Sequence, residues 1–167
     1  MDRTLTDLDT LQRAFIDAVY VQLKTFSQAA SELGVDKFTI QQLNKDLESY
    51  WRPITKIRNK WKSKKVGGNF WDFCHWYKST EQRCYYCGIT QTEIEELHAL
   101  GLTNKRTTRG KTLEIERKKP DESYSNIANL TYCCYWCNNA KTDTFTEEEF
   151  KPIGMAIGNV WKQRLRK

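Results

Sequence analysis

Apolar residues recur at helical spacing over most of the first fifty positions. Between residues 5 and 25 they fall three or four positions apart, which predicts a helix that Thr6 and Asp7 could cap. The next stretch, FSQAASELGVDKFTIQQLNKDL, carries two more helical patterns on either side of Gly34. The pattern therefore predicts a helical region over residues 1–50.

The two patterns around Gly34 resemble a helix-turn-helix, because small residues let the helices approach and a glycine suits the turn. Glutamine and threonine can read base edges, and lysine can meet phosphate. The second helix would present five such residues: Lys37, Thr39, Gln41, Gln42 and Lys45. The alternative is a helical hairpin without a DNA role, or one used for dimerisation. The net charge of −3 over residues 1–50 favours that alternative.

The excess positive charge of the chain, +6, comes from one run, WRPITKIRNKWKSKK, which holds seven basic residues and no acidic one. A basic run that contains Trp51 and Trp61 is typical of binding to a phosphate backbone. The alternative is a solvated helix face whose tryptophans pack inward. The basic residues that we expect to contact DNA here are Arg58, Lys60, Lys62, Lys64 and Lys65.

Residues 51–80 are interpreted as a connecting segment. Gly67 and Gly68 would end a helix, and the aromatic stretch FWDFCHWY that follows is expected to pack against the C-terminal domain. The sequence shows no signal peptide and no apolar run near 18 residues, which predicts a cytoplasmic protein without a membrane span. Six cysteines in a reducing compartment favour metal binding over disulfides.

Four of the cysteines form two CxxC pairs, Cys84 with Cys87 and Cys134 with Cys137. Each pair places two sulfurs close enough to share a metal, and two pairs complete the tetrahedral thiolate set that Zn²⁺ prefers. Cys134 is preferred over Cys133 because only Cys134 gives a CxxC spacing. The sequence therefore predicts one structural zinc site with a 46-residue insertion between its halves.

The insertion and the residues after it predict a strand in TLEIER, a polar loop, a second strand in NLTYC and a helix that starts at NNAK. A further helix begins after Thr146, where three glutamates occupy the first turn. We therefore expect an α+β chain, with the helical N-terminal region followed by a zinc-bound domain over residues 81–167.

In this order, CxxCG, LEIER, the asparagine of NLTYC and CxxCNxxK resemble the HNH, or ββα-metal, endonuclease superfamily, in particular its restriction-type members. The resemblance implies a metal-dependent endonuclease that hydrolyses phosphodiester bonds of double-stranded DNA, and that could act as a homodimer. It implies that Glu116 and Asn138 bind a catalytic Mg²⁺ or Mn²⁺ and that Asn129 orients the site. Lys118, Lys119 and Lys141 would contact DNA, although Lys141 could also pack locally.

Two positions depart from the family pattern. Glu116 replaces the usual aspartate, and Arg117 stands where a histidine base is expected. Arginine cannot accept a proton under ordinary conditions, but it can clamp phosphate. His98, Tyr86 and Tyr124 are the substitute bases that the sequence offers, or the metal itself could generate hydroxide. The alternative function is a non-catalytic zinc DNA-binding or regulatory protein on an HNH-derived fold.

Overall fold

The structure, a computed structural model, describes residues 8–103 and 109–166, and the predicted caps at residues 6 and 7 lie outside this range. The chain divides into two compact units. The first consists of Met1–Ser63 with Gly68–Tyr77, and the second is the remainder of the chain. The predicted connecting segment is thus shared between the two units rather than standing between them.

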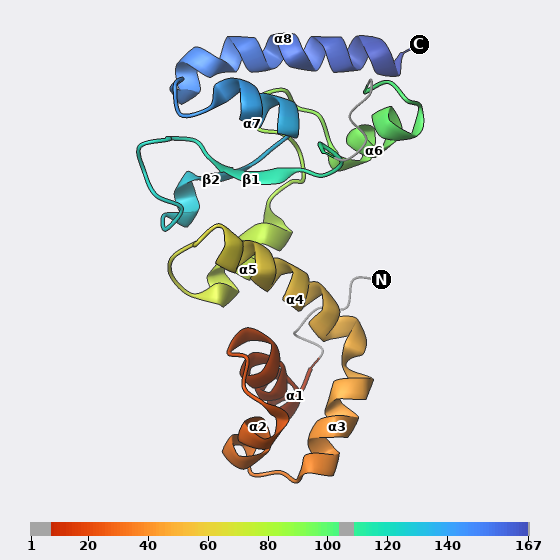
Figure 1. Ribbon diagram of the computed structural model, residues 1–167, viewed down its shortest axis with the longest axis vertical. Helices are drawn as coiled ribbons and strands as arrows, with labels where there is room; N and C mark the ends of the chain where they lie inside the picture. The colour runs from red at the N-terminus through yellow and green to blue at the C-terminus, as the bar shows by residue number, and fades with distance from the viewer. Residues whose placement is uncertain (1–7, 104–108, 167) are drawn as a thin grey trace. The chain divides into compact units, whose positions relative to one another are not determined.

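The first unit is helical. Its first helix begins after Asp9, whose side chain accepts from the backbone N–H of Gln12, and it continues into a π-helical turn that ends at Val21. The elements are α1 (Thr10–Ile16), η2 (Asp17–Val21), α2 (Phe26–Leu33), α3 (Lys37–Asp46), α4 (Glu48–Ser63) and α5 (Phe70–Ser79) (Figure 1).

The helices α2 and α3 form the hairpin expected around Gly34. This residue lies in the left-handed region, with φ of 65°, where glycine carries no steric cost. Asp36 then caps α3 by accepting from the backbone N–H of Thr39. Ala30 of α2 and Ile40 of α3 are buried. A three-residue turn that begins with this glycine therefore joins the two helices, which is the geometry of a helical hairpin.

The basic run lies on α4, and its tryptophans pack inward, as the alternative interpretation predicted. Trp51 stacks on Tyr20 with ring centroids 4.6 Å apart and donates from Nε1 to the carbonyl oxygen of Asn44. Trp61 packs edge-on against Phe70. These two indoles therefore stabilise the first unit and do not form an exposed stacking platform for bases.

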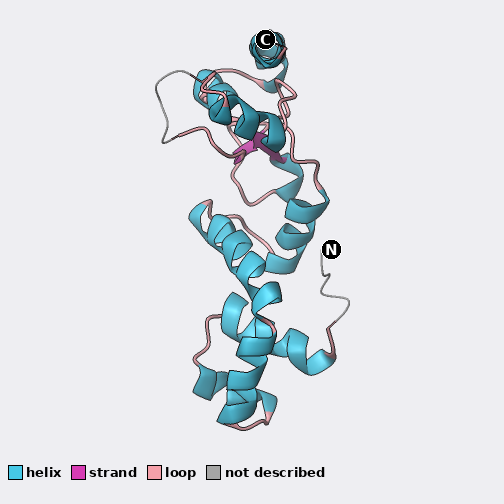
Figure 2. Ribbon diagram, turned by 90° about the vertical axis from the view of Figure 1, so that its right-hand side faces the viewer, coloured by secondary structure: helices cyan, strands magenta, loops and turns pink. Residues whose placement is uncertain are grey.

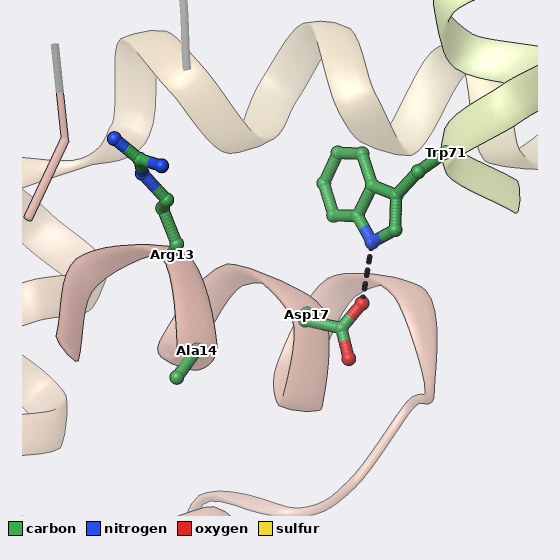
Figure 3. Close-up of a pocket in the computed structure, with 4 residues that line it drawn as sticks. All are labelled: Arg13, Ala14, Asp17 and Trp71. Carbon is green, nitrogen blue, oxygen red and sulfur yellow. Dashed lines mark hydrogen bonds between the residues drawn. The ribbon is translucent and has the colours of Figure 1, made fainter. Parts of the chain in front are cut away.

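The aromatic stretch on α5 belongs to the first unit as far as Tyr77, whereas the sequence analysis expected it to pack on the zinc-bound domain. Trp71 donates from Nε1 to Asp17 Oδ1 at 2.8 Å, which joins α5 to η2 (Figure 3). A pocket of about 290 Å³ opens beside this bond, with Arg13 and Ala14 also lining it. Both Asp17 oxygens already accept hydrogen bonds, the second from Gln22.

The second unit contains the strand, loop, strand and helix that the sequence predicts. The two short strands form an antiparallel pair with Glu114 opposite Cys133 and Arg117 opposite Leu130. They are the magenta segments of Figure 2. Helix α7 packs on β1, and α8 contacts both α6 and α7. The elements are α6 (Gln91–Ala99), β1 (Glu114–Arg117), η3 (Ile127–Asn129), β2 (Leu130–Cys133), α7 (Tyr135–Lys141) and α8 (Glu147–Leu165).

Helix α8 approaches the first CxxC turn through two buried glycines. A Cβ added at Gly154 would lie 2.6 Å from the Cβ of Tyr86, and one added at Gly158 would lie 2.3 Å from the carbonyl oxygen of Cys87. Thr146 caps this helix, as predicted, and forms a capping box with Glu149. The small glycine face therefore lets a long helix cover the backbone of the cysteine turn directly.

Candidate functional site

The four predicted cysteine ligands form one buried cluster. The sulfur atoms of Cys84, Cys87, Cys134 and Cys137 all lie within 4.8 Å of one another, and the Cys87 and Cys134 sulfurs are 3.6 Å apart. Four thiolates at about 2.3 Å from Zn²⁺ in a tetrahedron would be separated by about 3.8 Å. The cluster therefore fits a single tetrahedral zinc ion.

Local backbone hydrogen bonds shape the two halves of the cluster. The first half closes when Gly88 donates its backbone N–H to the carbonyl oxygen of Cys84 at 2.9 Å. In the second half, the backbone N–H of Cys137 donates to the Cys134 sulfur at 3.4 Å, so this half coincides with the start of α7. Tyr85 N–H donates to Tyr132 O, which joins the first turn to β2.

Cys133 is fully buried next to the cluster but is not one of its four members. The neighbouring Cys84 sulfur, together with burial, raises the pKa of the Cys133 thiol far above its ordinary value. The cluster contains Cys134 and not Cys133, which agrees with the choice of Cys134 on spacing.

Glu116 lies on β1 with its side chain only 13% exposed, in contact with a tyrosine from the following loop. Tyr124 donates its hydroxyl proton to Glu116 Oε2 at 3.1 Å and accepts from Lys64 Nζ at 3.4 Å. Burial, followed by the negative charge of Glu116, raises the pKa of Tyr124 to about 12. Tyr124 is therefore a protonated donor toward Glu116 at neutral pH.

Arg117 is held by several neighbours. Its guanidinium donates to the backbone oxygen of Glu122 at 3.2 Å and to Asp143 Oδ1 at 2.9 Å, and its Cζ lies 4.9 Å from the centroid of the Tyr124 ring. Arg117 Nε is 3.8 Å from the nearest Glu116 oxygen, too far for a hydrogen bond. The Asp143 side chain is 77% exposed, so its ion pair is open to exchange with an incoming anion.

Asn138, the second predicted metal ligand, lies on α7 and contacts β1. Its Nδ2 donates to Glu114 Oε2 at 2.5 Å, so its partner is the carboxylate two residues before Glu116. Alternate residues of a strand share one face, which places Glu114 and Glu116 side by side on β1. The sequence analysis missed Glu114, although this period-two spacing was a usable signal.

Asn129 is 96% buried and holds the loop after β1 by two hydrogen bonds. Its Oδ1 accepts from the backbone N–H of Lys119 at 2.9 Å, and its Nδ2 donates to the Lys119 carbonyl oxygen at 3.1 Å. The backbone N–H of Lys118 also donates to Asn129 O at 2.9 Å. These bonds fix the loop that follows β1, and the orienting role that the family resemblance implies for Asn129 stays a prediction.

Neither His98 nor Tyr86 has a hydrogen bond to Glu116 among the described residues. The His98 ring nitrogens lie 3.1 Å from the Gly110 carbonyl oxygen and 3.3 Å from the Thr103 hydroxyl, and the ring stacks on Trp136. Tyr86 is buried, and its hydroxyl has no partner among the described residues. Burial raises its pKa above its ordinary value. Among the described residues, Tyr124 is the candidate that directly contacts Glu116.

The predicted DNA-contacting residues of α3 lie mainly on its exposed side. Thr39 is half-buried and Gln42 donates to Asp46, whereas Lys37, Gln41 and Lys45 are exposed. The sequence analysis missed Phe38, which is 73% exposed on the same helix.

The remaining predicted cations differ in their surroundings. Lys62, Lys65 and Lys119 are exposed, whereas Arg58, Lys60, Lys64 and Lys118 are half-buried. Lys141 is only 1% exposed, and its ammonium has no hydrogen-bond partner among the described residues. Its placement agrees with the local packing role that was left open for it. No described helix has both the length and the apolar character needed to cross a bilayer.

No family model matches the chain, and no curated protein matches it. A solved structure does. The chain is similar to the rare-cutting HNH restriction endonuclease PacI. The match covers 68% of this chain and 78% of that chain, with 28% sequence identity and a TM-score of 0.49. PacI is described as perturbing DNA by an extraordinary mechanism.

Proposed function

We propose that the protein is a metal-dependent DNA endonuclease of the HNH type, with a structural zinc ion in the four-cysteine cluster. The main support for the proposal is the way in which β1, β2 and α7 pack together. The cysteine cluster anchors the start of α7, and a carboxylate on β1 and an amide on α7 lie at adjoining elements. A purely structural zinc domain does not require these two oxygen donors.

The donors fit a hard divalent cation. The carboxylate of Glu116 and the amide oxygen of Asn138 are ligands of the kind that Mg²⁺ and Mn²⁺ accept. When bound, such an ion stabilises negative charge on the scissile phosphate and lowers the pKa of a bound water. Tyr124 holds the Glu116 carboxylate in place, and Asn129 fixes the loop that follows β1.

Arg117 stands where HNH nucleases have a histidine. Its guanidinium supplies positive charge but cannot act as a base. Its guanidinium binds the scissile phosphate by exchanging its exposed contact with Asp143 for a phosphate oxygen. Tyr124 remains protonated at neutral pH because its pKa is raised to about 12. Without a histidine on β1, a divalent ion held by Glu116 and Asn138 would lower the pKa of a water enough for its proton to pass to bulk solvent.

Double-stranded DNA is the proposed substrate. The exposed face of α3 carries amide and ammonium groups that suit base edges and phosphate, and exposed lysines of α4 and of the β1 loop add positive charge. A homodimer would suit a palindromic target. Mg²⁺ or Mn²⁺ is the proposed catalytic ion.

The test is incubation of the purified protein with supercoiled plasmid and Mg²⁺ or Mn²⁺, with EDTA as the metal-free control. We expect metal-dependent nicking or linearisation, and its loss in Glu116→Gln with zinc content unchanged. Glu148→Gln, an exposed carboxylate in the first turn of α8, is the matched control and should cut normally. Absence of metal-dependent cutting on plasmid and on a mixed genomic DNA would refute the nuclease proposal.

The engaged ring of His98 favours a second candidate function, a non-catalytic zinc DNA-binding protein. Both of its nitrogens are within hydrogen-bond distance of other groups, and Arg117 stands in the place of the base. If this function is correct, the protein should slow the migration of duplex DNA in a gel-shift assay and should not cut DNA with Mg²⁺, with Mn²⁺ or without metal.

A further inference from the structure

We propose that Glu114 is a positioning residue that turns the side-chain amide of Asn138 so that its oxygen faces the catalytic divalent ion. The inference rests on the proposed function, and it assigns a role to a residue outside the predicted metal ligands. It is carried by one contact, in which Asn138 Nδ2 donates to Glu114 Oε2 at 2.5 Å.

The chemistry of the two groups fixes which end of the amide makes this contact. An ionised carboxylate can only accept hydrogen bonds, so it must face the NH₂ group of the amide. The amide oxygen, Oδ1, then points away from Glu114. Asn138 is half-buried, and Oδ1 accepts no hydrogen bond from the residues that the structure describes. The oxygen is thus left available as a ligand.

This orientation matters because the two ends of an asparagine amide have nearly the same shape. Rotation by 180° exchanges a metal-binding oxygen for an NH₂ group that a cation repels. The backbone N–H of Asn138 donates to Cys134 O at 2.9 Å, which anchors the residue beside the cysteine cluster. The backbone position is therefore set by α7, whereas the direction of the amide depends on Glu114.

The other proposed ligand, Glu116, lies on the same face of β1 and is oriented by a partner of its own. Glu114 and Glu116 are two residues apart on β1, which separates their Cα atoms by about 6.6 Å. Tyr124 donates to Glu116, and Glu114 accepts from Asn138, so each proposed ligand has its own hydrogen-bond partner. Partners of this kind orient metal ligands, and their loss typically lowers metal affinity about 10- to 100-fold.

The opposing interpretation is that Glu114 binds the ion directly. The substitution Glu114→Gln separates the two interpretations, because the introduced glutamine keeps an oxygen that can accept from Asn138 but loses the negative charge. Its NH₂ group can also donate to the Asn138 oxygen, so the amide direction is only partly kept. A positioning role therefore predicts a smaller loss of metal binding in Glu114→Gln than in Glu114→Ala. A ligand role predicts that both substitutions weaken binding to a similar degree.

The measurement is titration of zinc-loaded protein with Mn²⁺ alone, with free Mn²⁺ followed by electron paramagnetic resonance and zinc content checked in each variant. We expect one Mn²⁺ site in the wild type, a Kd raised at least about tenfold in Glu114→Ala, and a clearly smaller rise in Glu114→Gln. Equal losses in Glu114→Gln and Glu114→Ala would overturn the proposal, as would unchanged affinity in Glu114→Ala.

The outcomes also separate this inference from the proposed function. A wild-type protein that binds Mn²⁺ in a Glu114-dependent manner but never cuts DNA would refute the nuclease proposal and leave the positioning role intact. A protein that cuts DNA with Mg²⁺ and binds Mn²⁺ equally well in all the Glu114 variants would refute only the positioning role. Absence of any Mn²⁺ site in the wild type would overturn the positioning role and the proposed metal ligands together.

Discussion

Gly158 offers a sharp test of how α8 is held on the cysteine cluster. A methyl group at this position would lie 2.3 Å from the carbonyl oxygen of Cys87, and the nearest carbon of that carbonyl would be 3.2 Å away. Ordinary contact between such atoms begins at 3.4 Å. In Gly158→Ala the helix or the cysteine turn must therefore move by about 1 Å, and neither the helix nor the backbone of the turn can yield as a flexible side chain would.

The expected magnitude follows from two opposing effects. Overpacking of a well-packed contact costs about 1–3 kcal/mol, whereas replacing glycine by alanine in a helix interior stabilises it by about 1 kcal/mol. Because the clash is with the backbone of a proposed zinc ligand, Cys87, we place the cost of overpacking at the upper end of this range. A net loss of about 1–2 kcal/mol corresponds to a decrease in Tm of about 5–10 °C for a unit of this size.

The assay is thermal unfolding of the zinc-loaded protein, followed by circular dichroism, together with the rate of zinc release to a chromogenic chelator. Asn159→Ala is the matched control, because this neighbouring residue of α8 is exposed and also gains helix propensity. We expect the control to melt at or slightly above the wild-type temperature and to release zinc at the wild-type rate. A Gly158→Ala protein as stable as this control would refute the close approach of α8 to Cys87.

Four further results are expected. Removal of the metal by a strong chelator should abolish cooperative melting of the second unit and expose its cysteines to a thiol reagent. Asn129→Ala should destabilise the protein by about 2–3 kcal/mol in denaturant titrations, since it deletes two hydrogen bonds to the Lys119 backbone. The pKa of Tyr124, raised to about 12, contributes stability that is complete below pH 10 and is lost as pH rises through 12, so Tyr124→Phe should flatten the alkaline end of the stability profile. Phe38→Ala should weaken duplex binding in gel shifts without changing Tm, because this side chain is 73% exposed.

The zinc ligands and the order of elements around them were predictable because their signals are local. A CxxC spacing brings two sulfurs together within one turn, and the tetrahedral preference of zinc then requires the two pairs to meet. The alternation in TLEIER and the apolar run in NLTYC are equally local, and the structure places β1 and β2 at these positions. The choice of Cys134 over Cys133 followed from spacing alone and agrees with the cluster.

Packing partners were less predictable because they depend on distant parts of the chain. The pattern of residues 70–77 marked a buried aromatic helix but not the unit that buries it, and the contact between Trp71 and Asp17 spans 54 positions. The inward packing of Trp51 likewise depends on Tyr20. Apolar periodicity reports that a face is buried, and it carries no information on which surface covers that face.

The sequence by itself determined a two-stranded, helix-backed domain closed by four cysteines, since covalent spacing and metal geometry leave few alternatives. It also placed Arg117 where the family that the motifs resemble has a histidine. Only the tertiary structure decided that Tyr124 contacts Glu116, that Asp143 holds Arg117 and that Asn138 turns toward Glu114. Those contacts join side chains on different elements, and their directions are set by how β1, its loop and α7 pack together around the cluster.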